Sequence, residues 1–165
     1  MAVPRLRVTG VRPPRPYRPT ANELQSRARE YLERMPATDR AAIALNINLD
    51  TVGGDAHLTA LTSEFPNLAP FVRDTAAAAG IELGTYAPMM SNSDHFNFAR
   101  HGIPALRLVA GFDRPQCNIQ YILTRGDTRE KVALAELAAA ARLTAVLLAR
   151  ALTAGDADMA ALRNK

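Results

Sequence analysis

Two short stretches of the sequence bring together side chains that could do chemistry. Asp50 follows an alternating apolar stretch and precedes a glycine turn, and Ser93, Asp94 and His95 place a hydroxyl, a carboxylate and an imidazole in one polar loop. Open α/β sheets carry their sites at the carboxyl ends of strands, so Asp50 is a candidate metal ligand. Simpler readings stay open, since an Asp after a strand often caps a turn and Ser93 or Asp94 can cap a helix that leaves His95 exposed.

The other candidate residues have structural explanations. Asp127 stands three residues before Glu130 in a capping-box pattern, which explains it without chemistry. His57 and His101 have no acidic or imidazole neighbour at ligand spacing, so we expect both to be structural. The sequence contains no glycine-rich phosphate loop, no nucleophile elbow and no His-Glu-x-x-His helix.

Alternating strands and helices must position these residues, which predicts the α/β class. In residues 41–50, apolar side chains recur at every second position and amides fill the other face, as in a strand that ends at Asp50. Residues 103–109 are apolar almost throughout, which predicts a strand covered on both faces. The remaining expected strands are 57–62, 81–86 and 118–123, and the expected helices are 21–35, 67–79, a short one ending at Arg100, and a long one from about 128 to 152.

Charge and composition indicate one globular domain with a basic tail. The 165 residues are 48% hydrophobic and 22% charged, with a net charge of +4. Residues 1–20 contain five arginines, five prolines and no acid, so the rest of the chain is close to neutral. We expect this tail to be disordered, and we expect no nucleic-acid partner. Weak binding of phosphate backbones by the tail is the least favoured hypothesis, because a shaped basic groove is not indicated.

Membrane insertion, export and disulfide formation find no support in the sequence. Arg142 and Arg150 interrupt the longest apolar run before it could span a bilayer. The N-terminus has no apolar segment of signal-peptide length, which makes a cytoplasmic location the default expectation. Cys117 is alone and cannot form an internal disulfide.

Four motifs in order make the chain resemble the C-terminal half of the M28 zinc aminopeptidases. The resemblance covers about residues 24–152, and the motifs lie in 48–53, 91–98, 102–105 and 124–128, ahead of an alanine-rich helix. It implies a partial phosphorylase/hydrolase-like three-layer sandwich, with a mixed central sheet flanked by helices. It also implies a hydrolase in which two zinc ions activate water for attack on a peptide substrate, with a Glu as general base.

The resemblance assigns few ligands to this chain. It places Asp50 on the strand-end metal ligand and Ser93, Asp94 and His95 at the substrate pocket, and it puts Leu123 where the family has its last histidine ligand. The resemblance also places a pair of glutamates near residues 19–22, where this sequence has none, and Glu23 is the only carboxylate nearby. Zinc bound through one carboxylate is weak, so we expect weak or absent zinc binding and no catalytic residue in this chain.

We therefore expect a tail over 1–20, a partial M28 peptidase-like domain over 21–152 whose N-terminal metal-binding half is missing, and a frayed end over 153–165. The primary hypothesis is an M28-like zinc metallopeptidase of the aminopeptidase type that is inactive as this chain. The alternative is a non-catalytic binding or interaction module derived from the peptidase fold. A missing half would leave an unpaired strand edge, so we expect self-association or a complementing chain, with apolar exposure at 103–109.

Overall fold

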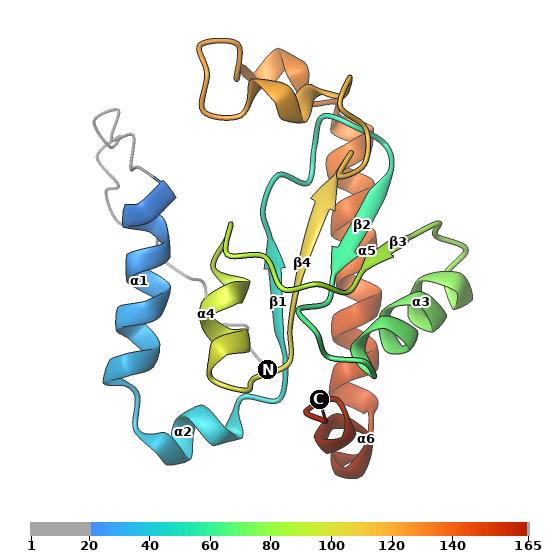
Figure 1. Cartoon of the computed structure of the whole chain (residues 1–165). Coiled ribbons are helices and arrows are strands. Elements are labelled where there is room, and N and C mark those ends of the chain that lie inside the picture. The colour runs from blue at the N-terminus through green and yellow to red at the C-terminus, as the bar shows by residue number, and fades with distance from the viewer. Residues whose placement is uncertain (1–20, 165) are drawn as a thin grey trace, which may run out of the picture.

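The structure of the protein is a computed structural model that describes the backbone of residues 21–164 and the side chains from residue 27 onward (Figure 1). The expected tail over residues 1–20, with the cap at Thr20, lies outside the described residues. Among the described residues, no helix has the length and apolar character needed to cross a bilayer.

A four-stranded mixed sheet forms the centre of the fold. Its strands are β1 (Asn46–Leu49), β2 (Leu58–Leu61), β3 (Gly84–Tyr86) and β4 (Ala105–Ala110), in the order β1-β4-β2-β3. β1 runs parallel to β4 and β2 runs parallel to β3, whereas β2 and β4 are antiparallel. The mixed sheet that the sequence predicted is therefore confirmed.

Helices cover the sheet in two outer layers. Figure 1 shows α1 (Ala21–Arg34) and α4 (His95–Arg100) on one side of the sheet, and α3 (Leu68–Ala78) and α5 (Leu134–Thr153) on the other. The short helices are α2 (Ala37–Ala42), α6 (Asp156–Ala161) and two 3₁₀ turns, η1 (Asn118–Tyr121) and η2 (Arg129–Lys131). This arrangement is the expected three-layer α/β sandwich.

The core explains why the long helix packs where it does. Leu143 and Leu147 stand four residues apart on one face of α5, and both are fully buried in the same core cluster as Leu106 and Leu108 of β4. All six residues of β4 are buried, which fits its position inside the sheet. The expected apolar exposure at 103–109 is therefore wrong, because β1 and β2 flank this strand and helices cover it.

Four local expectations are also corrected. Residues 118–123 form η1 and a turn rather than a strand, and residues 37–42 form α2 rather than a turn leading into a strand. The long helix begins at Leu134, since a separate 3₁₀ turn follows Thr128. Within the stretch expected to fray, residues 156–161 form α6, and Met159 and Leu162 bury their side chains in the core.

Candidate functional site

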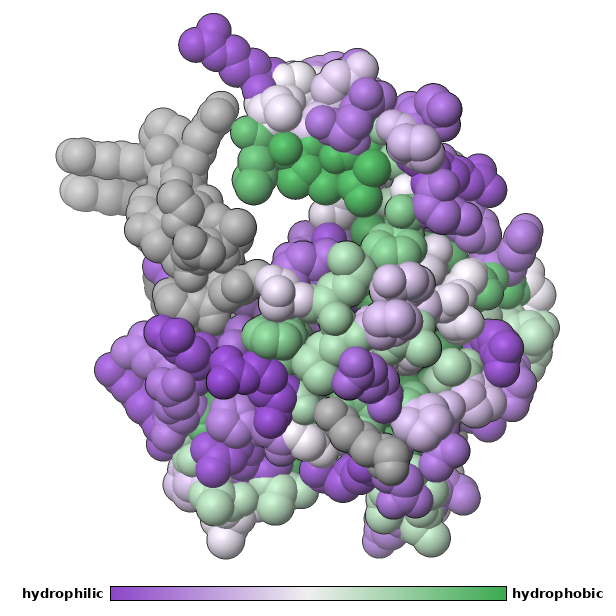
Figure 2. Space-filling model, viewed as in Figure 1, coloured by the Kyte–Doolittle hydropathy of each residue, from purple (hydrophilic) through white to green (hydrophobic). Residues whose placement is uncertain are grey.

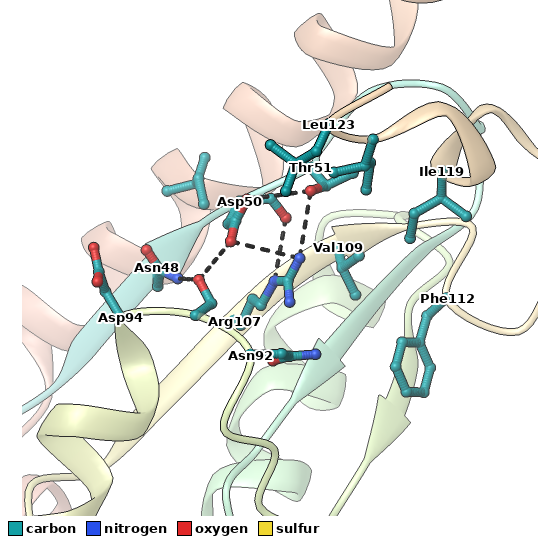
Figure 3. Close-up of a pocket in the computed structure, with 13 residues that line it drawn as sticks. Asn48, Asp50, Thr51, Asn92, Asp94, Arg107, Val109, Phe112, Ile119 and Leu123 are labelled. Carbon is teal, nitrogen blue, oxygen red and sulfur yellow. Dashed lines mark hydrogen bonds and ion pairs between the residues drawn. The ribbon is translucent and has the colours of Figure 1, made fainter. Parts of the chain in front are cut away.

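A pocket of about 520 Å³ opens at the carboxyl end of β1. Its floor is formed by residues 48–51, the loop 92–94 and Arg107 of β4, and its roof comes from residues 119–123 (Figure 3). Because β1 and β4 are parallel, both strands direct their carboxyl ends toward this edge of the sheet. The site therefore lies where open α/β sheets place theirs.

The carboxylate of Asp50 receives a short hydrogen bond on the pocket floor. Ser93 Oγ donates to Asp50 Oδ2 over 2.5 Å, and Asn48 Nδ2 donates to Ser93 Oγ over 2.6 Å. Asn48 and Asp50 lie on the same face of β1, two residues apart, so the strand itself sets the spacing of this relay. Asn48, one of the alternating amides noted in the sequence, thus orients the loop hydroxyl toward Asp50.

Arg107 supplies a positive charge beside the same carboxylate. Its Nη2 forms an ion pair with Asp50 Oδ2 at 3.5 Å, and its Nε donates to the backbone carbonyl of Asp50 over 3.3 Å. The side chain of Arg107 is only 7% exposed, whereas that of Asp50 is 43% exposed. Burial lowers the pKa of Arg107 and the charge of Asp50 raises it, but a guanidinium stays protonated at any pH at which the protein is folded.

Thr51 completes the set of contacts around Asp50. It has a φ of 64°, a left-handed conformation uncommon for residues other than glycine. In this conformation its hydroxyl donates to Asp50 Oδ1 over 3.1 Å and accepts from Arg107 Nη2 over 3.3 Å. The turn after β1 is therefore shaped so that Asp50 and Arg107 share a third polar partner.

Asp94 and His95 take different positions. Asp94 lines the pocket, and its Oδ1 is buried without a hydrogen-bond partner among the described residues. Burial and the charge of Asp50 raise the pKa of Asp94. His95 is fully buried as the first residue of α4 and does not line the pocket. Burial, followed by the positive charge of Arg107, lowers the pKa of His95 to about 4, so its ring is neutral at pH 7.

Of the four residues singled out in the sequence, Asp50, Ser93 and Asp94 thus meet in one pocket and His95 packs behind it. Neither Ser93 nor Asp94 caps α4, because the cap position shows no side-chain hydrogen bond. Sequence reasoning missed Arg107, although a single charge inside an otherwise apolar strand was the signal that could have found it.

The roof of the pocket is apolar. Ile119, Ile122 and Leu123 face the floor across the hollow, and Figure 2 shows apolar side chains of this segment overhanging it. Leu123 is 70% exposed and has a φ of 60°. Its backbone N–H donates to Asp127 Oδ2 over 3.2 Å, so Asp127 stabilises this turn instead of capping the long helix. Leu123, which the resemblance puts where the family has its last histidine ligand, lines the same pocket as Asp50 (Figure 3).

Hydrogen bonds join the floor to the roof. Asn118 N–H donates to the carbonyl of Gly54 over 3.1 Å, and Gly54 N–H donates to Glu136 Oε2 over 2.7 Å. The same Glu136 oxygen accepts from the N–H of Ala133 at the start of α5 over 3.1 Å. The loop after Asp50, the roof and α5 thus share one small network.

The donors present do not fit a zinc ion. Among the described residues, no three His, Cys, Asp or Glu side chains lie close enough to hold a metal. Residues 1–20 and Lys165 contain no such side chain, and the side chain of Glu23 lies outside those that the structure describes. The only donor that the resemblance assigns, Asp50, is already paired with a cation. At an effective dielectric constant of about 20, Arg107 would repel a divalent ion 4 Å away by about 8 kcal/mol, twice the repulsion of a monovalent cation, so it disfavours zinc at Asp50.

Comparison with known proteins identifies the family. Residues 26–148 match the sequence model of Peptidase family M28. The chain belongs to this family. No curated protein sequence matches it. The resemblance stated from the four motifs is therefore confirmed, and the matched range agrees with the range read from the sequence.

The M28 chain also shares its fold with solved aminopeptidases. The zinc aminopeptidase BSAP from Bacillus subtilis superposes with a TM-score of 0.69 at 20% identity, covering 84% of this chain and 36% of that one. The aminopeptidase from Aneurinibacillus sp. strain AM-1 gives 0.64 at 18% identity, covering 79% and 31%. The LapA aminopeptidase of Legionella pneumophila gives 0.63 at 15% identity, covering 82% and 38%. The chain thus spans about a third of these proteins.

Proposed function

We propose that this chain is a peptide-binding module of the M28 peptidase fold that holds the amino-terminal end of a peptide without hydrolysing it. The observation that carries the proposal is the state of Asp50. This half-exposed carboxylate lies on the floor of an open pocket, and its own chain already supplies the positive charge beside it. The family supports peptides as the ligand class, since the aminopeptidases of this fold act on the amino ends of peptides.

Polar groups on the floor suit an ammonium group. Asp50 exposes oxygen to the pocket, and Asp94 offers a second carboxyl group next to it. With Asp94 ionised, the two carboxylates and Arg107 together carry a net charge of −1, which one ammonium group neutralises, and that positive charge would lower the raised pKa of Asp94. A free amino terminus therefore binds better than an acetylated one.

The apolar roof suits an apolar first side chain. Ile119, Ile122 and Leu123 form one wall of the pocket, and Val109 and Phe112 line it from β4 and the turn that follows. Full burial of a leucine side chain is worth about 2–3 kcal/mol, and contact on one side roughly half of that. We therefore expect a peptide that begins with leucine to bind about tenfold more tightly than one that begins with glycine.

Zinc-dependent aminopeptidase activity is the second candidate, favoured by the family and by the zinc aminopeptidases that share the fold. It requires metal donors that the described residues do not assemble. A longer protein or a complementing chain would have to contribute them. This candidate predicts chromogenic hydrolysis that zinc stimulates and EDTA abolishes.

Calorimetry and an activity assay on the same preparation test both candidates. Leu-Gly-Gly, acetyl-Leu-Gly-Gly and Gly-Gly-Gly are titrated into the full chain with EDTA, and leucine p-nitroanilide is assayed with excess zinc. Asp50→Ala removes the carboxylate, and Asp39→Asn, an exposed substitution on α2 away from the pocket, is the matched control. Binding of Leu-Gly-Gly that Asp50→Ala weakens and Asp39→Asn does not supports the module. Absence of binding refutes it, and EDTA-sensitive turnover establishes the second candidate instead.

A further inference from the structure

A buried arginine in the central strand of a sheet needs an explanation. Arg107 stands in β4 between Leu106 and Leu108, which are both fully buried. Burying a charge is unfavourable unless it is paired, and a well-packed apolar side chain at such a position is often as stable or more stable. Stability alone therefore does not account for Arg107, and its contacts show where it acts.

The hydrogen bonds and the ion pair of Arg107 with the described residues converge on one residue and its neighbour. Nε binds the backbone carbonyl of Asp50, while Nη2 pairs with the Asp50 carboxylate and reaches the hydroxyl of Thr51. The register of the sheet produces this placement, because Arg107 lies directly beside Asn48 and on the same face. The guanidinium therefore fixes both the backbone and the side chain of Asp50.

We propose that Arg107 is the resident cation of this pocket: it neutralises Asp50 from within the chain and so excludes divalent metal ions from it. The proposal concerns the same pocket as the proposed function but does not require that peptides bind there. It makes Arg107 a specificity-determining residue. An Asp50 that is not paired with a cation is a metal donor, whereas Asp50 paired with Arg107 is part of a neutral polar floor.

The third nitrogen of the guanidinium defines what the pocket accepts in place of a metal. In Figure 3, Nη1 carries no dashed line and points away from Asp50, toward the side of the pocket where Asn92 lies. A hydrogen-bond donor at this position suits a carbonyl oxygen of a ligand whose amine lies at Asp50. An organic ligand with an amine beside a carbonyl therefore fits the floor better than a metal ion.

Zinc titration calorimetry on the full chain tests the proposal. Arg107→Met keeps an unbranched, flexible side chain, although a shorter one, and removes the charge. Arg107→Lys keeps the charge and removes the planar, forked guanidinium group. Asp50→Asn in the Arg107→Met background removes the carboxylate that Arg107 pairs with in the wild type. Circular dichroism on each variant confirms that it is folded before titration.

We expect zinc binding too weak to saturate in the wild type and in Arg107→Lys. In Arg107→Met we expect zinc to bind at least about tenfold more tightly than the weakest binding that the titration detects. The gain should disappear in the Asp50→Asn background. Leu-Gly-Gly titrated into Arg107→Lys should bind less tightly than into the wild type, because the donor toward the ligand carbonyl is displaced.

Two results would overturn the proposal. One is micromolar zinc binding by the wild type that Asp50→Asn alone weakens, which can be measured even if Arg107→Met does not fold. The other is a folded Arg107→Met whose zinc affinity equals that of the wild type. Failure of Leu-Gly-Gly to bind any variant would refute the peptide-binding function and leave metal exclusion by Arg107 to be decided by the zinc titrations.

Discussion

Replacing Ser93 by alanine tests whether the relay on the pocket floor contributes to stability. Ser93 is 7% exposed, and its hydroxyl both donates to Asp50 and accepts from Asn48. A hydrogen bond to a charged group contributes about 1.5–3 kcal/mol, and an amide left unpaired adds about 1 kcal/mol of destabilisation. Because the side chain of Asp50 is 43% exposed, water replaces part of the lost bond. We therefore expect Ser93→Ala to lower the free energy of unfolding by about 2 kcal/mol.

Urea denaturation followed by far-UV circular dichroism measures this loss, which corresponds to a fall in Tm of about 4–8 °C for a domain of this size. Thr153→Ala is the matched control, because it removes an exposed hydroxyl that bonds only within α5 and should change stability by less than about 0.5 kcal/mol. In a double-mutant cycle, Ser93→Ala and Asn48→Ala should couple by about 1 kcal/mol. Additive effects, or a Ser93→Ala protein as stable as the wild type, would show that the relay contributes nothing.

Three further substitutions test other parts of the fold. The fold lowers the pKa of His95 from 6.5 to about 4 and so disfavours its charged ring, which means that the wild type loses stability as pH falls from about 6.5 toward 4. His95→Phe should abolish this loss, which urea midpoints at pH 7 and pH 5 measure. An equal fall of the urea midpoint in both proteins would refute this. Gly111→Ala should cost about 1–3 kcal/mol, since Gly111 has a φ of 62° and an added Cβ would overlap Cys117 Sγ; an unchanged Tm would contradict it. Leu143→Ala should cost about 2–5 kcal/mol by opening a cavity beneath α5, measured by the same denaturation.

The sequence predicted the elements whose patterns are set by burial. The apolar run at 103–109 became the buried central strand, and the alanine-rich stretch became α5, which begins later than the expected cap at Asp127. Both patterns depend on which faces meet the core, which local spacing records. The predicted strand at 118–123 failed because its apolar side chains pack over the pocket instead of entering a sheet, and short apolar runs do not distinguish these cases.

The site could be predicted only in part. Asp50 and Ser93 were found because strand ends and polar loops are local signals, and the structure brings them within hydrogen-bond distance. Arg107 was missed because it lies 57 residues from Asp50 in sequence, and only the pairing of β1 with β4 brings the two together. The apolar role of Ile119 and Ile122 was missed for the same reason, since the roof is positioned by contacts with the distant loop around Gly54.

The network around Glu136 has a mechanical consequence for this pocket. One carboxylate oxygen of Glu136 binds both the turn that carries Gly54 and the N–H that precedes α5, and the carbonyl of Gly54 in turn binds Asn118 next to the roof. The loop after Asp50 and the roof of the pocket are therefore both hydrogen-bonded, directly or through Gly54, to the start of α5. A ligand that moves the roof must either move the loop after Asp50 with it or break these hydrogen bonds. The width of the pocket opening therefore depends on the start of α5 as well as on the residues that contact the ligand.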